Sequence, residues 1–487
     1  MKRSFLTTVI RRLFHPDTVP ARLSGQTASA RSVHGCRRQV DNKQSLITRA
    51  VCALAVATLV LLAGVADAQT KTEIQFWHAM EGQLGEAVSE LVNRFNQSQG
   101  EFEVKAVFKG TYPEVQAAAI AAYRQKNPPH IVQISDIGTQ SILLSDAVVP
   151  IYRLMKQQEI AVNWAGFIET VTTYYSREDK LYSMPFNAST PILYYNKAIF
   201  RKAGLGDTPP ATWQEVEAAS RKILASGTAT CGFTTPVLSW ALIENTFPWH
   251  DQPLATNQNG RTGLDTRLLI NSDFGRMHIG ALARWQKENI FSYAGQEKKM
   301  DQFINGDCAM LLQSSAFIGD FNKSLTFDWG TGQLPHWGPP YAKANTSLGG
   351  ASLWVLRGHE PADYRGVAQF MKFLIEPTQQ KWLATTTGWL PITKEAVKSL
   401  EDDSFYRKNP EKWTAVSQLL NAKPTSNSRG LRLGNFLQVR EVIELELENI
   451  CNGKKSVKDG LDAAVSRGNA ILREFKVNHG AAPQGEI

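Results

Sequence analysis

Arg440 is a candidate for binding an anion, judged by its residue type and its place in the chain. It lies in the stretch GLRLGNFLQVR, four residues into a helix expected to begin near Phe436. A guanidinium stays charged at any working pH, and its planar fork can donate two parallel hydrogen bonds to a phosphate. An arginine near a helix start is usually a solvated surface residue, and Arg432 in the same stretch is a competing candidate. The residues alone therefore leave the role of Arg440 open.

Neutral donors for the same chemistry occur elsewhere in the chain. Gly350, in the stretch GGASLWV, would let a backbone N–H approach an oxyanion closely, although a glycine at the start of a strand needs no ligand to explain it. Ser189 and Ser314 offer hydroxyl groups, and Tyr112 offers a phenol. Each of these residues alone is unremarkable.

Asp136 is suited to the opposite task, because a carboxylate accepts hydrogen bonds from vicinal hydroxyls and repels phosphate. It follows a strand expected over 131–135. The alternative is a structural role, in which Asp136 caps a helix beginning at 137–139. Both interpretations place the side chain just beyond the end of a strand, where ligands of parallel sheets bind.

The sequence contains no G-x-S-x-G elbow, no H-E-x-x-H pair and no P-loop. Its histidines show no metal-ligand spacing, and its cysteines suit no zinc site. We therefore expect no enzyme activity, no cofactor and no metal. The rival from another class is a secreted glycosidase with paired acids, which the 12 tryptophans and scattered carboxylates leave open.

The elements that position these residues begin with a run that predicts a parallel sheet. Strands are expected over 72–79, 102–108 and 131–135, with helices over about 84–95 and 113–125 between them. In 183–197, Pro185 and Pro191 keep the chain extended. This extended stretch leads into a buried strand at 192–195, so it suits a crossing from one domain to another past a ligand.

The rest of the chain mixes strands, loops and helices. Thr212 and Glu215 form a capping box that opens a helix running through Leu224. Strands are expected at 308–313 and 349–356, with a loop rich in glycine and proline over 331–350. Further helices are expected over 274–288, 298–305, 364–375, 378–386, 410–421, 437–451 and 456–474.

Seven stretches, in a fixed order, resemble the extracellular solute-binding proteins of ABC importers, and within that family the members that bind glycerol phosphates. The resemblance covers roughly residues 70–476. The stretches are FWHAMEG at 76–82, KGTY at 109–112, PFNASTPILYYNKAIFRKAGL at 185–205, NGDCAM at 305–310, GGASLWVL at 349–356, GWLPITK at 388–394 and GLRLGN at 430–435.

The resemblance implies an α/β, two-lobed periplasmic-binding-protein fold (type II) with discontinuous lobes and hinge crossovers. It divides the chain into a leader (1–68), a first lobe and a second lobe. The expected parts are 69–186 and 346–376 for the first lobe, and 187–345 and 377–487 for the second, the last being helical.

The resemblance also implies a ligand and partners. It makes Tyr112, Ser189, Ser314, Gly350 and Arg440 contacts to a small-molecule phosphate ester such as sn-glycerol-3-phosphate. It implies delivery to the membrane permease subunits and ATPase of an ABC importer, by a protein expected to be monomeric. A sugar- or oligosaccharide-binding protein, which would not need the arginine, is the alternative within the class.

Departures from the family pattern bear on the ligand's size. Asp136 stands where the family generally carries glutamate, and Trp389 stands where the glycerol-phosphate binders usually have tyrosine. Val237 replaces an expected aromatic wall, although Trp240 is retained. The changes at 136 and 237 enlarge the glycerol end, so a glycerophosphodiester such as glycerophosphocholine is the hypothesis, with Trp240 and Trp389 facing its quaternary ammonium.

The formal net charge of +8 comes from a leader, not from a surface that binds nucleic acid. Residues 1–68 hold 10 of the 53 basic and 3 of the 45 acidic residues, which leaves 43 − 42 = +1 for the remainder. Within this leader, about 43–68 has a charged start, an apolar run and the small-x-small sequence Ala66-Asp67-Ala68. We expect a cleaved secretory signal and a periplasmic protein; for 1–42 a misassigned start codon is the favoured explanation.

Three cysteines remain after this cleavage. Cys231 and Cys308 could pair in an oxidising compartment and leave Cys451 free, or all three could be buried thiols. The sequence does not decide between these alternatives.

Overall fold

The computed structural model describes residues 71–293, 295, 300–341 and 343–480 of the chain. The chain divides into a unit of residues 1–68 and a unit of residues 69–487. All described residues belong to the second unit. The expected signal sequence lies outside them, so it stays a prediction.

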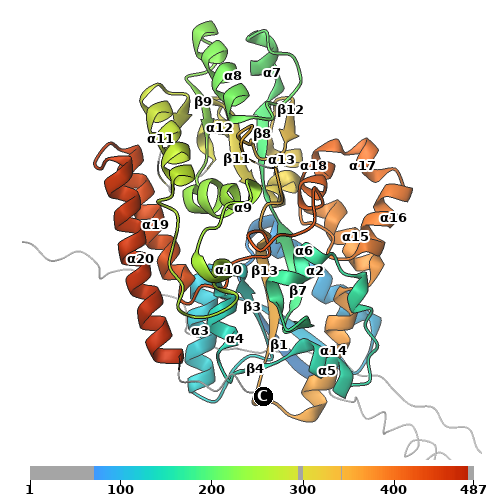
Figure 1. Ribbon diagram of the computed structural model, residues 1–487. Coiled ribbons are helices and arrows are strands. Elements are labelled where there is room, and N and C mark those ends of the chain that lie inside the picture. The colour runs from blue at the N-terminus through green and yellow to red at the C-terminus, as the bar shows by residue number, and fades with distance from the viewer. Residues whose placement is uncertain (1–70, 294, 296–299, 342, 481–487) are drawn as a thin grey trace, which may run out of the picture. The chain divides into compact units, whose positions relative to one another are not determined.

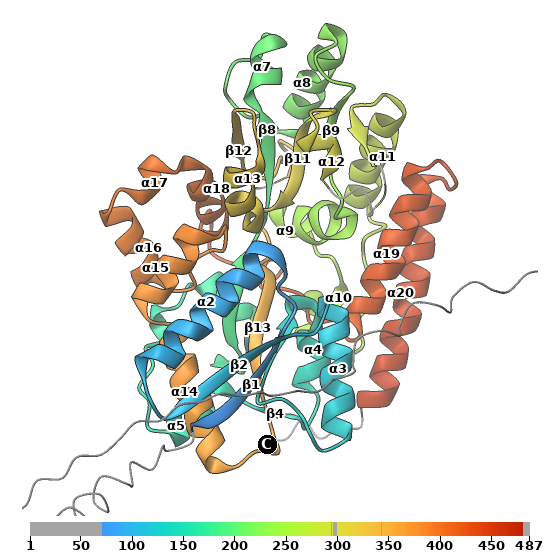
Figure 2. The ribbon, with the colours of Figure 1, turned by 180° about the vertical axis from the view of Figure 1, so that it is seen from behind.

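Two β-sheets organise the second unit (Figures 1 and 2). In pairing order, the strands of sheet 1 are β2 (Phe102–Phe108), β1 (Thr72–His78), β3 (Ile131–Ser135), β13 (Gly349–Leu356) and β4 (Val148–Val149), with β7 (Met184–Ser189) also pairing to β13. The strands of sheet 2 are β10 (Phe291–Ser292), β9 (Cys231–Thr234), β11 (Cys308–Ser314), β8 (Pro191–Asn196) and β12 (Trp329–Gly332).

The expected parallel sheet is confirmed for β1, β2 and β3, which pair in parallel. It is incomplete as a description of sheet 1, because β13 enters antiparallel beside β3 and also pairs antiparallel with β4 and β7. Side chains alternate between two apolar clusters: Ile131 belongs to one and Val132 to the other. This period of two shows that sheet 1 is covered on both faces.

Helix α2 packs on β2, helix α14 packs on β1, and helix α3 packs on β3. The helices up to residue 175 are α2 (Gly82–Ser98), α3 (Tyr112–Arg124), η1 (Asp136–Gly138), α4 (Thr139–Leu143), α5 (Ile151–Gln157), η2 (Trp164–Gly166) and α6 (Glu169–Tyr175). The short hairpin β5 (Ser176–Arg177) and β6 (Lys180–Leu181) follows.

The helices between β8 and β12 accompany sheet 2. They are α7 (Lys197–Lys202), α8 (Trp213–Ser226), η3 (Trp240–Asn245), α9 (Thr246–Trp249), α10 (Thr256–Gly260), α11 (Asp273–Lys287), α12 (Asp301–Ile304), η5 (Ser315–Phe317) and α13 (Ile318–Ser324). The capping box predicted at Thr212 and Glu215 is present and starts α8. Asn196 accepts a hydrogen bond from the Ile199 N–H and so caps α7.

The C-terminal part is helical, as expected. Its helices are α14 (Pro361–Leu374), α15 (Pro377–Thr386), α16 (Lys394–Asp402), α17 (Phe405–Lys408), α18 (Pro410–Leu419), α19 (Phe436–Cys451) and α20 (Val457–His479). Sequence patterns missed α16 and α17, as well as β12, whose second half fell in the expected loop. Helix α15 contacts α2 and α14, whereas α18 contacts β8 and β12.

The chain passes between the two sheets at Thr190, the single residue between β7 and β8. The Thr190 hydroxyl lies 2.7 Å from that of Thr346, which precedes β13 on the return pass. The Gln418 amide of α18 donates to the Thr190 hydroxyl (2.9 Å) and to the Pro191 carbonyl (2.8 Å). All three side chains that meet here are fully buried. The expected extended crossing is therefore present, and its first part is strand β7.

Cys231 and Cys308 form a disulfide, which decides between the two alternatives left by the sequence. The two residues are direct partners in the parallel pair β9–β11, and their Cα atoms lie 4.5 Å apart. Cys451 is a free thiol, and burial raises its pKa to about 12. Such a thiol is a poor nucleophile, since the thiolate is the reactive form.

Removing this disulfide is expected to lower the free energy of unfolding by roughly 2–4 kcal/mol, because the bond closes a loop between residues 77 apart. The double variant Cys231→Ser/Cys308→Ser should show this loss in urea unfolding, while Cys451→Ser, the matched control, should change stability by less than about 1 kcal/mol. Equal unfolding midpoints for both variants would contradict the expectation.

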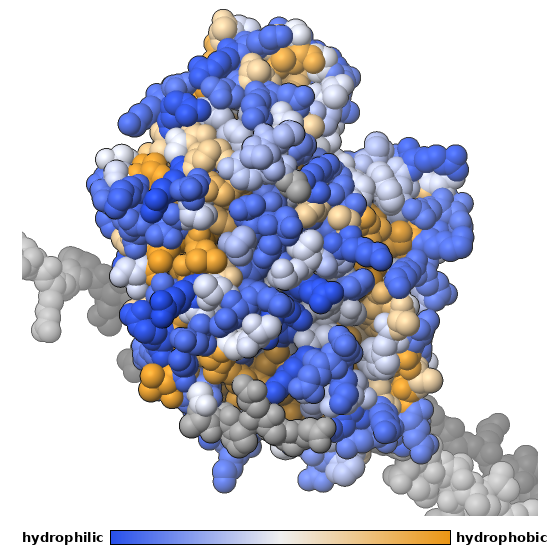
Figure 3. Space-filling model, viewed as in Figure 1, coloured by the Kyte–Doolittle hydropathy of each residue, from blue (hydrophilic) through white to orange (hydrophobic). Residues whose placement is uncertain are grey.

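The face of the second unit in Figure 3 is mostly hydrophilic, with apolar residues in small separate groups. Within the described part of the chain, no helix is both long enough and apolar enough to span a bilayer.

Candidate ligand-binding site

Arg440 lies in the first turns of α19, as predicted, and its fork is occupied by Glu244 of η3. Its Nε donates to one Glu244 carboxylate oxygen (2.7 Å) and its Nη2 to the other (2.5 Å). The Glu244 side chain is 2% exposed, whereas that of Arg440 is 25% exposed. Among the described residues, none accepts a hydrogen bond from Arg440 Nη1. Arg440 is therefore held at one edge and open at the other.

Glu244 was not among the residues selected from the sequence. It ends the apolar run Ala241-Leu242-Ile243 within a segment of π-helix. Such segments are frequent at functional sites. The Ser239 hydroxyl donates to the same carboxylate (2.8 Å). A carboxylate in an apolar run is a signal that could have been used, because a buried charge requires a partner.

Two further carboxyl groups lie close to this ion pair. Burial raises the pKa of Asp136 to about 7, against the opposing effect of the Arg440 guanidinium, and Glu244 adds to the rise. Burial likewise raises the pKa of Glu444 to about 7, although Glu444 accepts a hydrogen bond from the Ser239 N–H (2.9 Å). One guanidinium is thus surrounded by three carboxyl groups from η1, η3 and α19.

Tyr112 is tied to the strand that precedes the crossing. Its hydroxyl accepts a hydrogen bond from the Asn187 amide (2.7 Å), and Asn187 in turn accepts one from Gln133 (2.8 Å). Burial raises the pKa of Tyr112 well above its usual value, and the charge of Asp136 adds to this. The phenol is therefore neutral. Tyr112 lies near Asp136, although the two residues were expected at opposite ends of the ligand.

Gly350, Ser189 and Trp240 meet where β13 begins. β13 pairs with β7 so that Gly349 lies opposite Ser189 and Gly350 opposite Ala188. The Trp240 indole lies against Gly349, since a Cβ built there would come within 2.4 Å of the ring. Gly350 has φ of +113°, and a Cβ there would lie 1.8 Å from the Asn187 carbonyl oxygen. Glycine is thus required at 350 by the backbone itself.

Trp389 and Ser314 join the same region through their neighbours. The Leu390 N–H donates to the Ala188 carbonyl (2.8 Å), next to Ser189. The hydroxyl of Ser315 donates to the carbonyl of Gly388, which adjoins Trp389. Trp389 is 3% exposed, and its ring packs against that of Phe186 with centroids 5.6 Å apart.

The Ser314 hydroxyl accepts a hydrogen bond from the Ala316 N–H (3.2 Å) and so caps η5. A cap is a sufficient structural reason for this serine. Contacts of their own or of adjacent residues thus link six of the eight predicted residues: Tyr112, Ser189, Trp240, Ser314, Gly350 and Trp389. Arg440 is joined to Trp240's helix through Glu244, and Asp136 interacts electrostatically with Arg440 and Tyr112. Contact of these eight residues with a ligand stays a prediction.

Arg432, the competing arginine, is 6% exposed and donates to the Ser176 carbonyl (2.7 Å). Burial lowers its pKa to about 9. It belongs to the packing between the β5–β6 hairpin and the loop before α19. Arg440, with its accessible edge, is the better candidate of the two.

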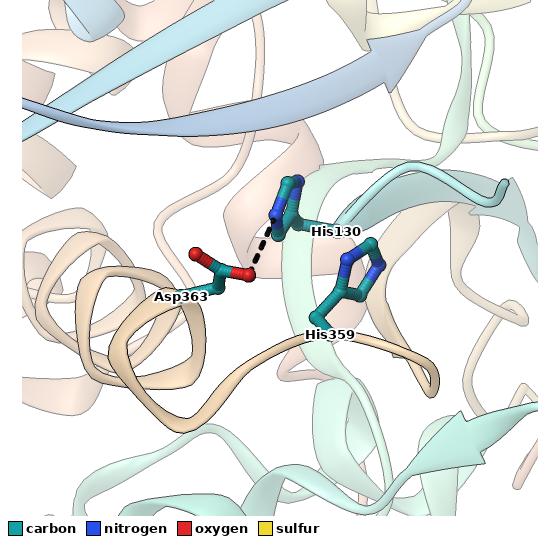
Figure 4. A group of neighbouring side chains, drawn as sticks. All are labelled: His130, His359 and Asp363. Atoms are coloured by element: carbon teal, nitrogen blue, oxygen red, sulfur yellow. Dashed lines mark ion pairs between the residues drawn. The ribbon is translucent and has the colours of Figure 1, made fainter.

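A group of two histidines and an aspartate lies apart from these residues (Figure 4). His130 Nδ1 accepts the Gln75 N–H (3.0 Å), so neutral His130 carries its proton on Nε2, the atom 3.5 Å from Asp363. His359 Nε2 lies 3.1 Å from the Pro129 carbonyl. A metal-bound histidine normally donates through its second nitrogen, which His130 cannot do here. The cluster is therefore better explained as a hydrogen-bonded junction than as a metal site.

A cavity of about 510 Å³ opens elsewhere, between α5, α6 and the β5–β6 hairpin. Tyr152, Lys156, Trp164, Asp179 and Lys180 are among its lining residues. None of the eight predicted residues lines it.

The class of protein follows from comparison with known proteins. A family model described as "Bacterial extracellular solute-binding protein" matches residues 90–414. The chain belongs to this family, as expected. Its fold is the two-lobed α/β fold of the maltose-binding-like periplasmic proteins, shared with solved structures such as the GacH receptor of Streptomyces glaucescens (TM-score 0.69).

Particular relatives are closer in sequence. The sn-glycerol-3-phosphate-binding periplasmic protein UgpB of Rhizobium meliloti is 40% identical over 423 residues, which is 86% of this chain and 98% of the relative. The protein of that name from Pectobacterium atrosepticum is 40% identical over 442 residues, covering 90% and 98%. Among solved structures, UgpB from Mycobacterium tuberculosis in complex with glycerophosphocholine has a TM-score of 0.70 at 23% identity, covering 83% of this chain and 99% of that one.

Proposed function

We propose that residues 69–487 form the periplasmic solute-binding component of an ABC importer, which captures sn-glycerol-3-phosphate or glycerophosphodiesters and delivers them to the permease. The observation that carries the proposal is the accessible edge of Arg440, in a chain 40% identical to proteins named for binding this phosphate ester. The protein acts without catalysis and without a cofactor. Its partners are the permease subunits and the ATPase.

In this proposal Arg440, Gly350, Ser189, Ser314 and Tyr112 hold the phosphate end. Trp240 and Trp389 lie around the glycerol end. Asp136, expected at that end too, faces Arg440 and therefore lies close to the phosphate end. The proposed lobe boundaries are those given above, except that the first one moves from 186/187 to Thr190, because β7 still pairs with β13 of sheet 1 up to Ser189. Closure of two lobes by rotation at a few crossing residues is the motion expected of such proteins.

The test is calorimetric titration of residues 69–487 with glycerol-3-phosphate, glycerophosphocholine and maltose. Binding of either phosphate ester without maltose binding is expected. Binding of maltose alone would overturn the proposal and favour an oligosaccharide-binding protein. The ratio of the two ester affinities tests the hypothesis of an enlarged glycerol end: if glycerol-3-phosphate bound and glycerophosphocholine produced no heat, that hypothesis would be wrong.

A further inference from the structure

The geometry points to Glu244 as the residue that sets the charge of the phosphate ester this site accepts. By holding one edge of Arg440 and cancelling its charge, Glu244 favours a singly charged phosphodiester over a doubly charged phosphomonoester. This inference rests on the proposed function and deepens it. Glu244 acts through Arg440, so it is a positioning residue and not a predicted ligand contact.

The first step is the geometry of the ion pair. Glu244 uses both carboxylate oxygens on Arg440 Nε and Nη2, and its Oε1 also accepts the Ser239 hydroxyl. A bidentate pair of this kind fixes the plane of the guanidinium. Because Glu244 is 2% exposed and Arg440 is 25% exposed, the carboxylate is shielded and the remaining edge of the arginine is accessible. A ligand phosphate can therefore reach Arg440 without displacing Glu244.

The second step is the charge around that edge. Arg440 and Glu244 together are neutral. The groups facing Arg440 are Asp136 from η1, Tyr174 from α6 and Glu244 from η3, with Glu444 on α19 itself. Burial keeps Tyr174 neutral, since it raises its pKa far above the usual range. Each proton lost from Asp136 or Glu444 adds negative charge to a site whose cation, Arg440, is already paired with Glu244.

The third step is the charge of the ligand. A phosphomonoester loses its second proton near pH 6, whereas a phosphodiester has no second proton to lose and keeps one negative charge. Near a paired arginine and two carboxyl groups, the second negative charge is repelled more than it is attracted. The preference for the diester should therefore grow as the pH rises through the second pKa of the monoester.

The experiment is calorimetric titration of the wild-type chain with glycerol-3-phosphate and glycerophosphocholine at about pH 5.5 and 8. We expect the affinity for the diester relative to the monoester to increase by about tenfold or more over this range. A monoester that bound more tightly at the higher pH, relative to the diester, would overturn the inference even without a variant.

Variants assign the effect to Glu244. Glu244→Gln keeps an oxygen for the guanidinium but removes the charge, so at pH 8 it should shift the relative affinity toward the monoester by about tenfold. Glu244→Asp keeps the charge and should keep the wild-type preference. Glu441→Gln, one residue from Arg440 but exposed, is the matched control and should change nothing.

The outcomes separate the two ideas. Binding of neither ester would overturn the proposed function and this inference together. Binding of both, with a ratio that responds neither to pH nor to Glu244→Gln, would overturn this inference and leave the proposed function standing. Thermal unfolding of each variant establishes that it is folded; if Glu244→Gln is not folded, the wild-type pH series and Glu244→Asp decide.

Discussion

Replacing Arg440 by alanine is expected to lower the affinity for both phosphate esters by about 100-fold or more. Truncating one partner of a close charge pair in a binding site typically costs about 2–5 kcal/mol, part of which is the cost of leaving the other charge unpaired. Here the loss has two sources. The ligand loses its cationic donor, and Glu244, which is 2% exposed, is left as an uncompensated negative charge beside the phosphate.

Calorimetry with both esters measures the loss, and thermal unfolding reports whether the variant remains folded. The double variant Arg440→Ala/Glu244→Gln removes the uncompensated charge, so it should regain stability without regaining affinity. Arg365→Ala, which alters an arginine whose side chain is 57% exposed, is the control and should bind as the wild type does. If Arg440→Ala bound both esters within about threefold of the wild-type affinity, the binding free energy would change by less than about 1 kcal/mol. Arg440 would then not be a ligand contact.

Replacing Gly350 by alanine is expected to destabilise the protein by about 3–5 kcal/mol. The new Cβ would lie 1.8 Å from the Asn187 carbonyl oxygen, and φ of +113° is strained for any residue with a side chain. The only relief is to move β13 away from β7. That displacement would also disturb Ser189 and the Asn187–Tyr112 hydrogen bond, so ligand affinity should fall with stability.

Urea unfolding in the absence of ligand measures the loss of stability. Gly280→Ala is the matched control, because Gly280 lies in α11 and a Cβ there would meet nothing within 4 Å. That change should be neutral or stabilise by up to about 1 kcal/mol, since alanine is the better helix former. If Gly350→Ala unfolded within 1 kcal/mol of the control, the backbone argument for glycine at 350 would be wrong.

Local signals were enough to predict much of the fold. The capping box at Thr212 and Glu215 starts α8 as expected, and the alternation of strands and helices before Asp136 gives the parallel part of sheet 1. The place of β13 was not predictable from local signals, because β3 and β13 pair across more than 200 residues of chain. For the same reason the sequence left the cysteines open: only the register of β9 against β11 brings Cys231 beside Cys308.

The candidate site, like the fold, was predictable from the sequence only in part. The resemblance to the family selected eight residues that the structure connects. A family motif marks residues that come together only in the folded chain, so it gives information that local patterns do not. Glu244 was missed because its partner Arg440 is 196 residues away, and the carboxylate in its apolar run was not used as a signal. The two carboxyl groups with raised pKa, Asp136 and Glu444, likewise depend on burial that only the folded chain creates.

The contact between Thr190 and Thr346 has a mechanical consequence. The two passes of the chain between the sheets are bound to each other and to Gln418, with no side chain exposed among the three. Sliding one pass along the other would break buried hydrogen bonds, whereas turning both together leaves them intact. Relative movement of sheets 1 and 2 is therefore expected to turn the two passes together and not to slide one along the other. In the proposed closure of the two lobes, this joint would keep Thr190, Thr346 and Gln418 at the same spacing while the sheets move.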